Sequence, residues 1–270
     1  MDLDGVGSPA GLAARIHELL PDLDLPVSLE ELCKQLDISA ITELETDGFE
    51  AALLTDEHKS SGAILHARGR HPARTRFSIA HELGHFLIPS HRPSTSNSMQ
   101  CSLDHLLTSD AKAKDKRRRI EAEANRFAAH LLMPPAMVRK AILGSDTNLQ
   151  AIATMADMFG VSKEAMARTW VEQHPDPVAI VIAQHGRIAR YYRGEDFPWI
   201  ACARGETLPD GSNALDLDVT PGRYSELEEI EPDTWLGERD AQRALALDEQ
   251  VLGQSSGYRM ILLVGELDED

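Results

Sequence analysis

The chain has 270 residues, of which 42% are hydrophobic, and a formal net charge of −17. This acidic balance argues against direct nucleic-acid binding, because phosphate contacts need a positively charged surface. No apolar run approaches the ~20 residues of a membrane-spanning helix, and the acidic stretch Met1–Asp4 lacks the apolar core of a signal peptide. Three widely spaced cysteines predict no disulfide framework, so we expect a cytoplasmic protein.

Two helices and two strands are predicted in the N-terminal quarter. Apolar spacing favours helices at Pro9–Leu20 and Val27–Leu36. The second begins at Ser28 with the spacing of a capping box. Short apolar runs at Glu50–Leu54 and Gly62–Ala67 flank a polar turn and predict two strands. We expect the helices to cover the sheet that these strands form.

The segment 76–87 contains the string His-Glu-Leu-Gly-His, which is the zinc-protease signature. On a helix, His81 and His85 lie four residues apart and share one face, so both can bind one metal ion. Glu82 follows the first histidine directly and is placed to take a proton from a water at the open metal position. Ser78 is the expected N-cap of this helix.

Segments on either side of this helix supply further hypotheses. In zinc peptidases an edge strand beside the metal helix binds the substrate backbone, and we assign that role to Gly62–Ala67, with an ordinary core strand as an equally favoured alternative. Cys101 lies in the loop after the helix, where a thiolate could occupy the open metal position, although a bystander thiol is the simpler interpretation. A hydrogen-bond donor that helps the metal to stabilise the oxyanion is expected among four histidines, none of which is favoured: His66, His71, His91 and His105.

A third metal ligand is expected from a helix that starts near Arg119 and stops before Pro134. Two acids lie at its start, Glu121 and Glu123, and they point about 200° apart, so only one can face a site. Glu121 shares a face with Asn125, which favours Glu121 as the ligand and Asn125 as its outer partner. Glu123 is expected to be solvated or to interact with the helix dipole.

Two further helices, Leu149–Phe159 and Lys163–Gln173, are joined by the turn Gly-Val-Ser and resemble a helix-turn-helix. Within 148–172 the bases Lys163 and Arg168 are outnumbered by three acids. A recognition helix without positive charge reads DNA poorly. We therefore interpret this pair as packing or as a docking surface, with DNA binding as the less favoured alternative.

The run His-Pro-Asp-Pro after residue 173 predicts a domain boundary. Beyond it we expect a hairpin of Val178–Ala183 and Arg187–Tyr192, and a last strand at Arg259–Val264. Most of the net negative charge lies in 205–270. This region carries no motif that predicts a reaction.

Three stretches together are similar to the ImmA/IrrE family of bacterial zinc peptidases. They are Arg-Phe-Ser-Ile-Ala-His-Glu-Leu-Gly-His from residue 76, Glu-x-Glu-Ala-Asn-Arg-Phe-Ala-Ala-x-Leu-Leu-Met-Pro from residue 121, and Phe-Gly-Val-Ser from residue 159. The resemblance covers about residues 25–172. It implies His81, His85 and Glu121 as ligands and Glu82 as general base. It also implies a cytoplasmic endopeptidase that cleaves a helix-turn-helix repressor and so derepresses a stress or mobile-element regulon.

The predicted fold is α+β. A mainly helical, zincin-like peptidase domain with a small antiparallel sheet is expected over 1–174, including the HTH-like helices 148–173. An acidic, mixed but mainly β domain is expected over 175–270, as a sensor or a substrate-docking module of the kind that some family members carry.

The predicted function is a Zn²⁺-dependent endopeptidase, with Mn²⁺ as an alternative metal, acting on an XRE-type repressor. Two rival functions are a zinc-binding regulator that controls a repressor without cleaving it and a DNA-binding regulator that uses residues 148–172. No contact with nucleic acid or membrane is expected.

Overall fold

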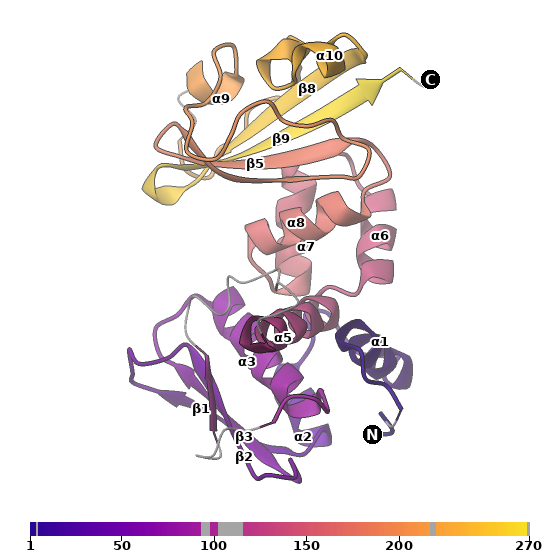
Figure 1. Ribbon diagram of the computed structural model, residues 1–270, viewed down its shortest axis with the longest axis vertical. Coiled ribbons are helices and arrows are strands. Elements are labelled where there is room, and N and C mark those ends of the chain that lie inside the picture. The colour runs from indigo at the N-terminus through magenta and orange to yellow at the C-terminus, as the bar shows by residue number, and fades with distance from the viewer. Residues whose placement is uncertain (4, 93–97, 102–115, 217–219, 269–270) are drawn as a thin grey trace. The chain divides into compact units, whose positions relative to one another are not determined.

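The computed structural model describes residues 1–3, 5–92, 98–101, 116–216 and 220–268 (Figure 1). These residues fall into two compact units. The first comprises 1–134 with 156–162, and the second comprises 135–155 with 163–270. The sequence placed a boundary at 174/175, whereas the contacts group residues 135–155 and 163–174 with the C-terminal sheet. Along the described chain, no helix combines the length and the apolar character needed to cross a bilayer.

The first unit contains a mixed sheet with the strand order β1-β3-β2-β4. Its strands are β1 (Ile38–Leu44), β2 (Ala51–Thr55), β3 (Gly62–Ala67) and β4 (Ser98–Cys101). Strand β1 pairs with β3 in parallel, whereas the other pairs are antiparallel. The predicted strands β2 and β3 are confirmed. Strand β1 escaped prediction because only its first residue is buried, which leaves no alternation to detect.

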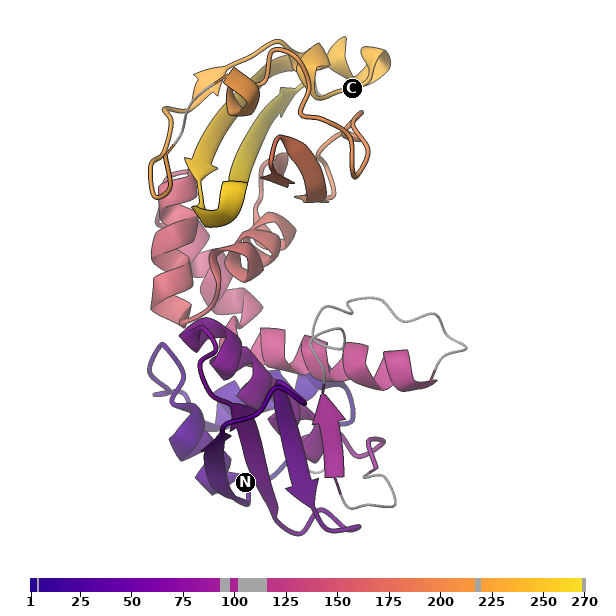
Figure 2. The same cartoon turned by 90° about the vertical axis from the view of Figure 1, so that its left-hand side faces the viewer.

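The assignment of Gly62–Ala67 as a substrate-binding edge strand was wrong. Strand β3 lies between β1 and β2, so ladders on both sides use its backbone groups. Among the described strands, β1 and β4 hold the edges of this sheet, and Figure 2 shows β4 in magenta at one of them.

The helices of the first unit lie where apolar periodicity placed them: α1 (Pro9–Leu19), α2 (Leu29–Gln35), α3 (Pro72–Leu87) and α5 (Lys116–Leu132). One cap prediction was right in position only, and the other was wrong. Ser28 is the N-cap residue of α2, as predicted, but its side chain makes no capping hydrogen bond within the described chain, so the capping box does not form. Helix α3 begins at Pro72 and is capped by His71, whose Nδ1 accepts from the Ala73 amide at 3.3 Å. The helix starts at Pro72 because proline suits the first helical position. Ser78 therefore lies inside the helix, where its side chain is buried.

Helix α3 packs on β2 and β3 and against α5, and α1 covers the other side of α5 (Figure 1). A glycine sets the approach of α3 to α5. A Cβ atom at Gly84 would lie 2.9 Å from Cδ1 of Phe127, a fully buried ring of α5. The two helices that carry the predicted ligands are therefore in contact at a position where only a hydrogen fits.

The second unit contains α6 (Pro135–Leu143), α7 (Leu149–Phe159, which extends into the first unit), α8 (Lys163–Gln173) and an antiparallel sheet of order β6-β5-β9-β8-β7. Its strands are β5 (Val178–Gln184), β6 (Arg187–Arg193), β7 (Glu228–Glu229), β8 (Ala244–Gly253) and β9 (Tyr258–Leu267). Short helices α9 (Asn213–Asp216) and α10 (Glu238–Ala241) lie in the connections. The α+β class, the hairpin and the closing strand are confirmed.

Strand β8 was missed because it carries an acid at a core position. Glu249 is fully buried, and burial raises the pKa of its carboxyl. Its oxygens accept hydrogen bonds from the Ser212 hydroxyl at 2.9 Å, the Ala214 amide at 3.0 Å and the Trp235 indole N–H at 3.0 Å. The carboxyl group therefore joins the connecting segments to the sheet, because buried polar groups need such partners.

Replacing Gly84 with alanine should force Phe127 and α5 away from α3. Overpacking of this kind costs about 1–3 kcal/mol. We expect the urea midpoint of G84A to fall accordingly. Gly48→Ala is the matched control, because Gly48 lies in the same unit and an added Cβ meets its nearest atom at 3.5 Å. Equal stability of both variants would contradict a close approach at Gly84.

Candidate metal centre

Helix α3 places two imidazoles side by side. The Nε2 atoms of His81 and His85 are 3.0 Å apart, and the ring centroids are 4.7 Å apart. Both rings and the Glu82 carboxyl group between them in sequence are fully buried. Burial lowers the pKa of His85 to about 3, so this imidazole is neutral at physiological pH and its lone pair is available to a metal ion.

Helix α5 contributes a carboxylate to the same point. Oε2 of Glu121 lies 3.3 Å from Nε2 of His81 and 3.6 Å from Nε2 of His85. The ligand atoms of the three residues lie within 4.8 Å of one another, so they could hold one metal ion. The sequence offered Glu121 and Glu123 as candidates for the third ligand, and Glu121 is the one that lies beside the two imidazoles.

The tautomer of His81 is fixed by Asn125. Nδ1 of His81 lies 2.9 Å from Oδ1 of the Asn125 amide. An amide oxygen only accepts, so Nδ1 carries the proton and Nε2 presents its lone pair to Glu121 and His85. The structure thus places Asn125 behind His81, at the helical spacing from Glu121 that the sequence indicated.

Behind His85 lies a second chain of contacts that sequence reasoning missed. Nδ1 of His85 lies 3.0 Å from Nδ1 of His91, and Nε2 of His91 lies 3.0 Å from Oε2 of Glu123. Oε1 of Glu123 accepts from Arg119 at 2.8 Å. Glu123 is therefore not simply solvated, since its side chain is only 23% exposed. His91 was one of four equivalent histidine candidates, and its spacing from His85 gave no signal because it lies beyond the helix.

The backbone of His85 is anchored as well. Nζ of Lys59, in the turn between β2 and β3, donates to the carbonyls of His85 at 2.7 Å and Ile88 at 2.8 Å. These carbonyls belong to the end of α3, where intrahelical donors run out. Burial, together with the nearby charge of Arg92, lowers the pKa of Lys59 to about 8.

The remaining sequence candidates lie elsewhere. His66 on β3 makes its ring contact with the Ala67 carbonyl at 3.5 Å, and His71 caps α3. His105 lies outside the described residues, as does the side chain of Cys101, whose backbone pairs with Ala51 in the sheet. The proposed thiolate gate therefore stays a prediction.

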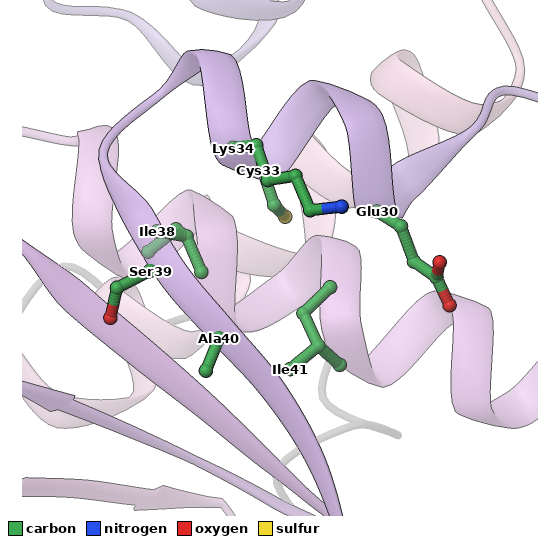
Figure 3. A pocket seen from close by; sticks show the side chains of 7 residues that line it. All are labelled: Glu30, Cys33, Lys34, Ile38, Ser39, Ala40 and Ile41. Atoms are coloured by element: carbon green, nitrogen blue, oxygen red, sulfur yellow. The ribbon is translucent and has the colours of Figure 1, made fainter.

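A cavity of about 290 Å³ lies between α2 and β1, and its lining includes none of the ligand-cluster residues (Figure 3). Its lining residues are Glu30, Cys33, Lys34, Ile38, Ser39, Ala40 and Ile41. Burial raises the pKa of the Cys33 thiol to about 12, so this cysteine is protonated and unreactive at neutral pH. Among the described residues, the group of converging metal ligands lies instead between α3 and α5.

Sequence comparison assigns the domain that carries the cluster. Residues 33–171 match the peptidase M78 family, described as the IrrE N-terminal-like domain. The chain belongs to this family. Membership identifies a metallopeptidase-type regulator family and agrees with the His-Glu-Leu-Gly-His helix and the Glu121 helix, which both lie within the matched range. No curated protein is significantly similar to the chain.

Among solved structures that resemble the chain is one that aligns along most of its length. It is a Mycobacterium tuberculosis transcriptional regulator, with a TM-score of 0.52 and 17% sequence identity, and the alignment covers 96% of this chain and 72% of that one. At this identity the likeness shows the fold alone. It supports the α+β architecture for both parts of the IrrE-like chain.

The geometry predicts unequal roles for the two acids of α5. Glu121→Ala removes a carboxylate from the cluster and should lower zinc affinity by more than about 100-fold, whereas Glu123→Ala acts through His91 and should lower it by about 10-fold. Competition with a chromophoric chelator measures both. A larger loss in the Glu123 variant would reverse the assignment.

Proposed function

We propose that this IrrE-like protein is a zinc-dependent endopeptidase. The observation that supports it best is the convergence of the lone pairs of His81 and His85 with the Glu121 carboxylate, next to the buried acid Glu82. Two imidazoles and one carboxylate are the ligand set of catalytic zinc in peptidases, which leaves a position for water or substrate. Mn²⁺ is the second metal that such ligands accept.

When bound, zinc lowers the pKa of a coordinated water towards ~7 and polarises the carbonyl of the scissile peptide. His81, His85 and Glu121 would hold the ion. Glu82 accepts the proton of the attacking water and then donates it to the leaving amine, because a general base near the reaction can act as general acid in the second step. Burial of Glu82 keeps bulk solvent from competing for that proton.

The proposed substrate is a helix-turn-helix repressor of the XRE type, whose cleavage releases stress or mobile-element genes. Membership in a metallopeptidase-type regulator family favours a regulatory substrate. The net charge of −17 favours a protein partner over DNA. In this proposal the acidic C-terminal region, 175–270, serves as a sensor or as a docking module.

Incubation of the zinc-loaded protein with a small repressor encoded beside its gene tests this proposal. Intact mass spectrometry should detect two fragments whose masses add up to the repressor plus one water. A stable complex without fragments would instead support the alternative, a zinc-binding regulator that controls the repressor without proteolysis.

Glu82→Gln separates metal binding from proton transfer. The amide has the same shape as the carboxyl group but cannot act as a general base, and loss of such a base costs about 10²–10⁴-fold in rate. We expect this variant to bind zinc with wild-type affinity and to lose cleavage. Undiminished cleavage would remove Glu82 from the mechanism.

A further inference from the structure

His85 occupies a weak place on its helix. It lies in the last turn of α3, which ends at Leu87. Helix ends fray because their terminal carbonyls lack intrahelical donors. His81 lies one turn further inside and is held by Asn125 from α5. Lys59 anchors the backbone at this end of α3 through the His85 and Ile88 carbonyls, but it does not orient the imidazole. The His85 ring therefore needs a support equivalent to Asn125, and the described residues around it supply one.

We propose that His91 is the positioning residue for His85, with Glu123 as the acid that orients it. This inference rests on the proposed function, because it concerns how His85 would hold zinc. His91 follows α3 through a turn in which its amide donates to the Ile88 carbonyl at 3.1 Å, and its ring is fully buried between His85 and Glu123.

The donors and acceptors of this relay fit in one arrangement. The Glu123 carboxylate only accepts, so Nε2 of His91 carries the proton that fills the 3.0 Å contact. Nδ1 of the neutral His91 then has a lone pair and accepts the Nδ1 proton of His85. This leaves Nε2 of His85 with a lone pair directed at the ligand cluster. The opposite tautomer of His91 would place a lone pair against the carboxylate.

The relay also connects two elements that both carry ligands. Glu123 stands on α5, two residues from Glu121, and His85 stands on α3. Arg119 of α5 fixes the second oxygen of Glu123 at 2.8 Å. Each metal-facing histidine is thus oriented from α5, His81 by Asn125 and His85 by Glu123 through His91. Outer partners of this type change metal affinity by about 10–100-fold.

The test measures zinc affinity of the full chain by chelator competition, together with the unfolding temperature of the metal-free protein. Three variants are compared: H91F, which keeps a ring but no hydrogen bond, E123Q, which keeps shape but no charge, and the double variant. We expect H91F to bind zinc about 10–100-fold more weakly and E123Q about 10-fold more weakly. The double variant should be no weaker than H91F, because Glu123 acts through His91.

Two controls separate positioning from general destabilisation. His66→Gln changes a histidine outside the cluster, and Arg126→Gln removes an exposed charge from α5. Both control variants should bind zinc within about twofold of the wild-type affinity, because residues that are not coupled to the ligand cluster change its affinity little. If H91F does not fold, the test rests on E123Q. The Glu123 side chain is partly exposed, so its replacement disturbs the core less than replacement of the buried His91.

Zinc affinities of H91F and E123Q equal to wild type would overturn the relay. Additive losses in the double variant would show that Glu123 does not act through His91. Failure of the wild-type protein itself to bind zinc would instead contradict the proposed function. The two failures are therefore distinguishable in one set of measurements.

Discussion

The organising constraint of the first unit is the contact between α3 and α5 at Gly84 and Phe127. Each helix carries part of the ligand cluster, and neither part suffices alone. An added Cβ at Gly84 would clash with a fully buried ring, so the spacing of the helices is fixed by packing rather than by the polar groups. This packing brings Glu121 to 3.3 Å from His81.

With the helices in contact, the polar groups of the cluster form an inner layer of ligands and an outer layer of hydrogen-bond partners. The inner layer consists of three acceptors that point at one another, which is unfavourable without a cation. The outer layer gives each imidazole a partner that fixes its proton on the far nitrogen. The buried hydrogen bonds on the Nδ1 atoms of His81 and His85 therefore leave the lone pairs of both Nε2 atoms directed at one point. This arrangement favours metal binding more than it favours packing.

Sequence patterns predicted the elements whose chemistry is local. The His81–His85 pairing follows from helical spacing, and Glu121 could be preferred to Glu123 because Asn125 shares its face. What escaped prediction depends on tertiary contacts. Lys59 and His91 contact His85, and Glu123 contacts His91, only after separate segments of the chain have folded together. Likewise, β8 hides a buried acid, Glu249, whose donors come from distant connections.

Zinc K-edge X-ray absorption on protein purified without chelators tests the central claim most directly. The account predicts one zinc per chain, with two imidazole nitrogens and a carboxylate oxygen among its ligands, and loss of this signal in a His81→Ala, His85→Ala double variant. Absence of zinc from the wild-type protein, or an unchanged spectrum in the double variant, would contradict it.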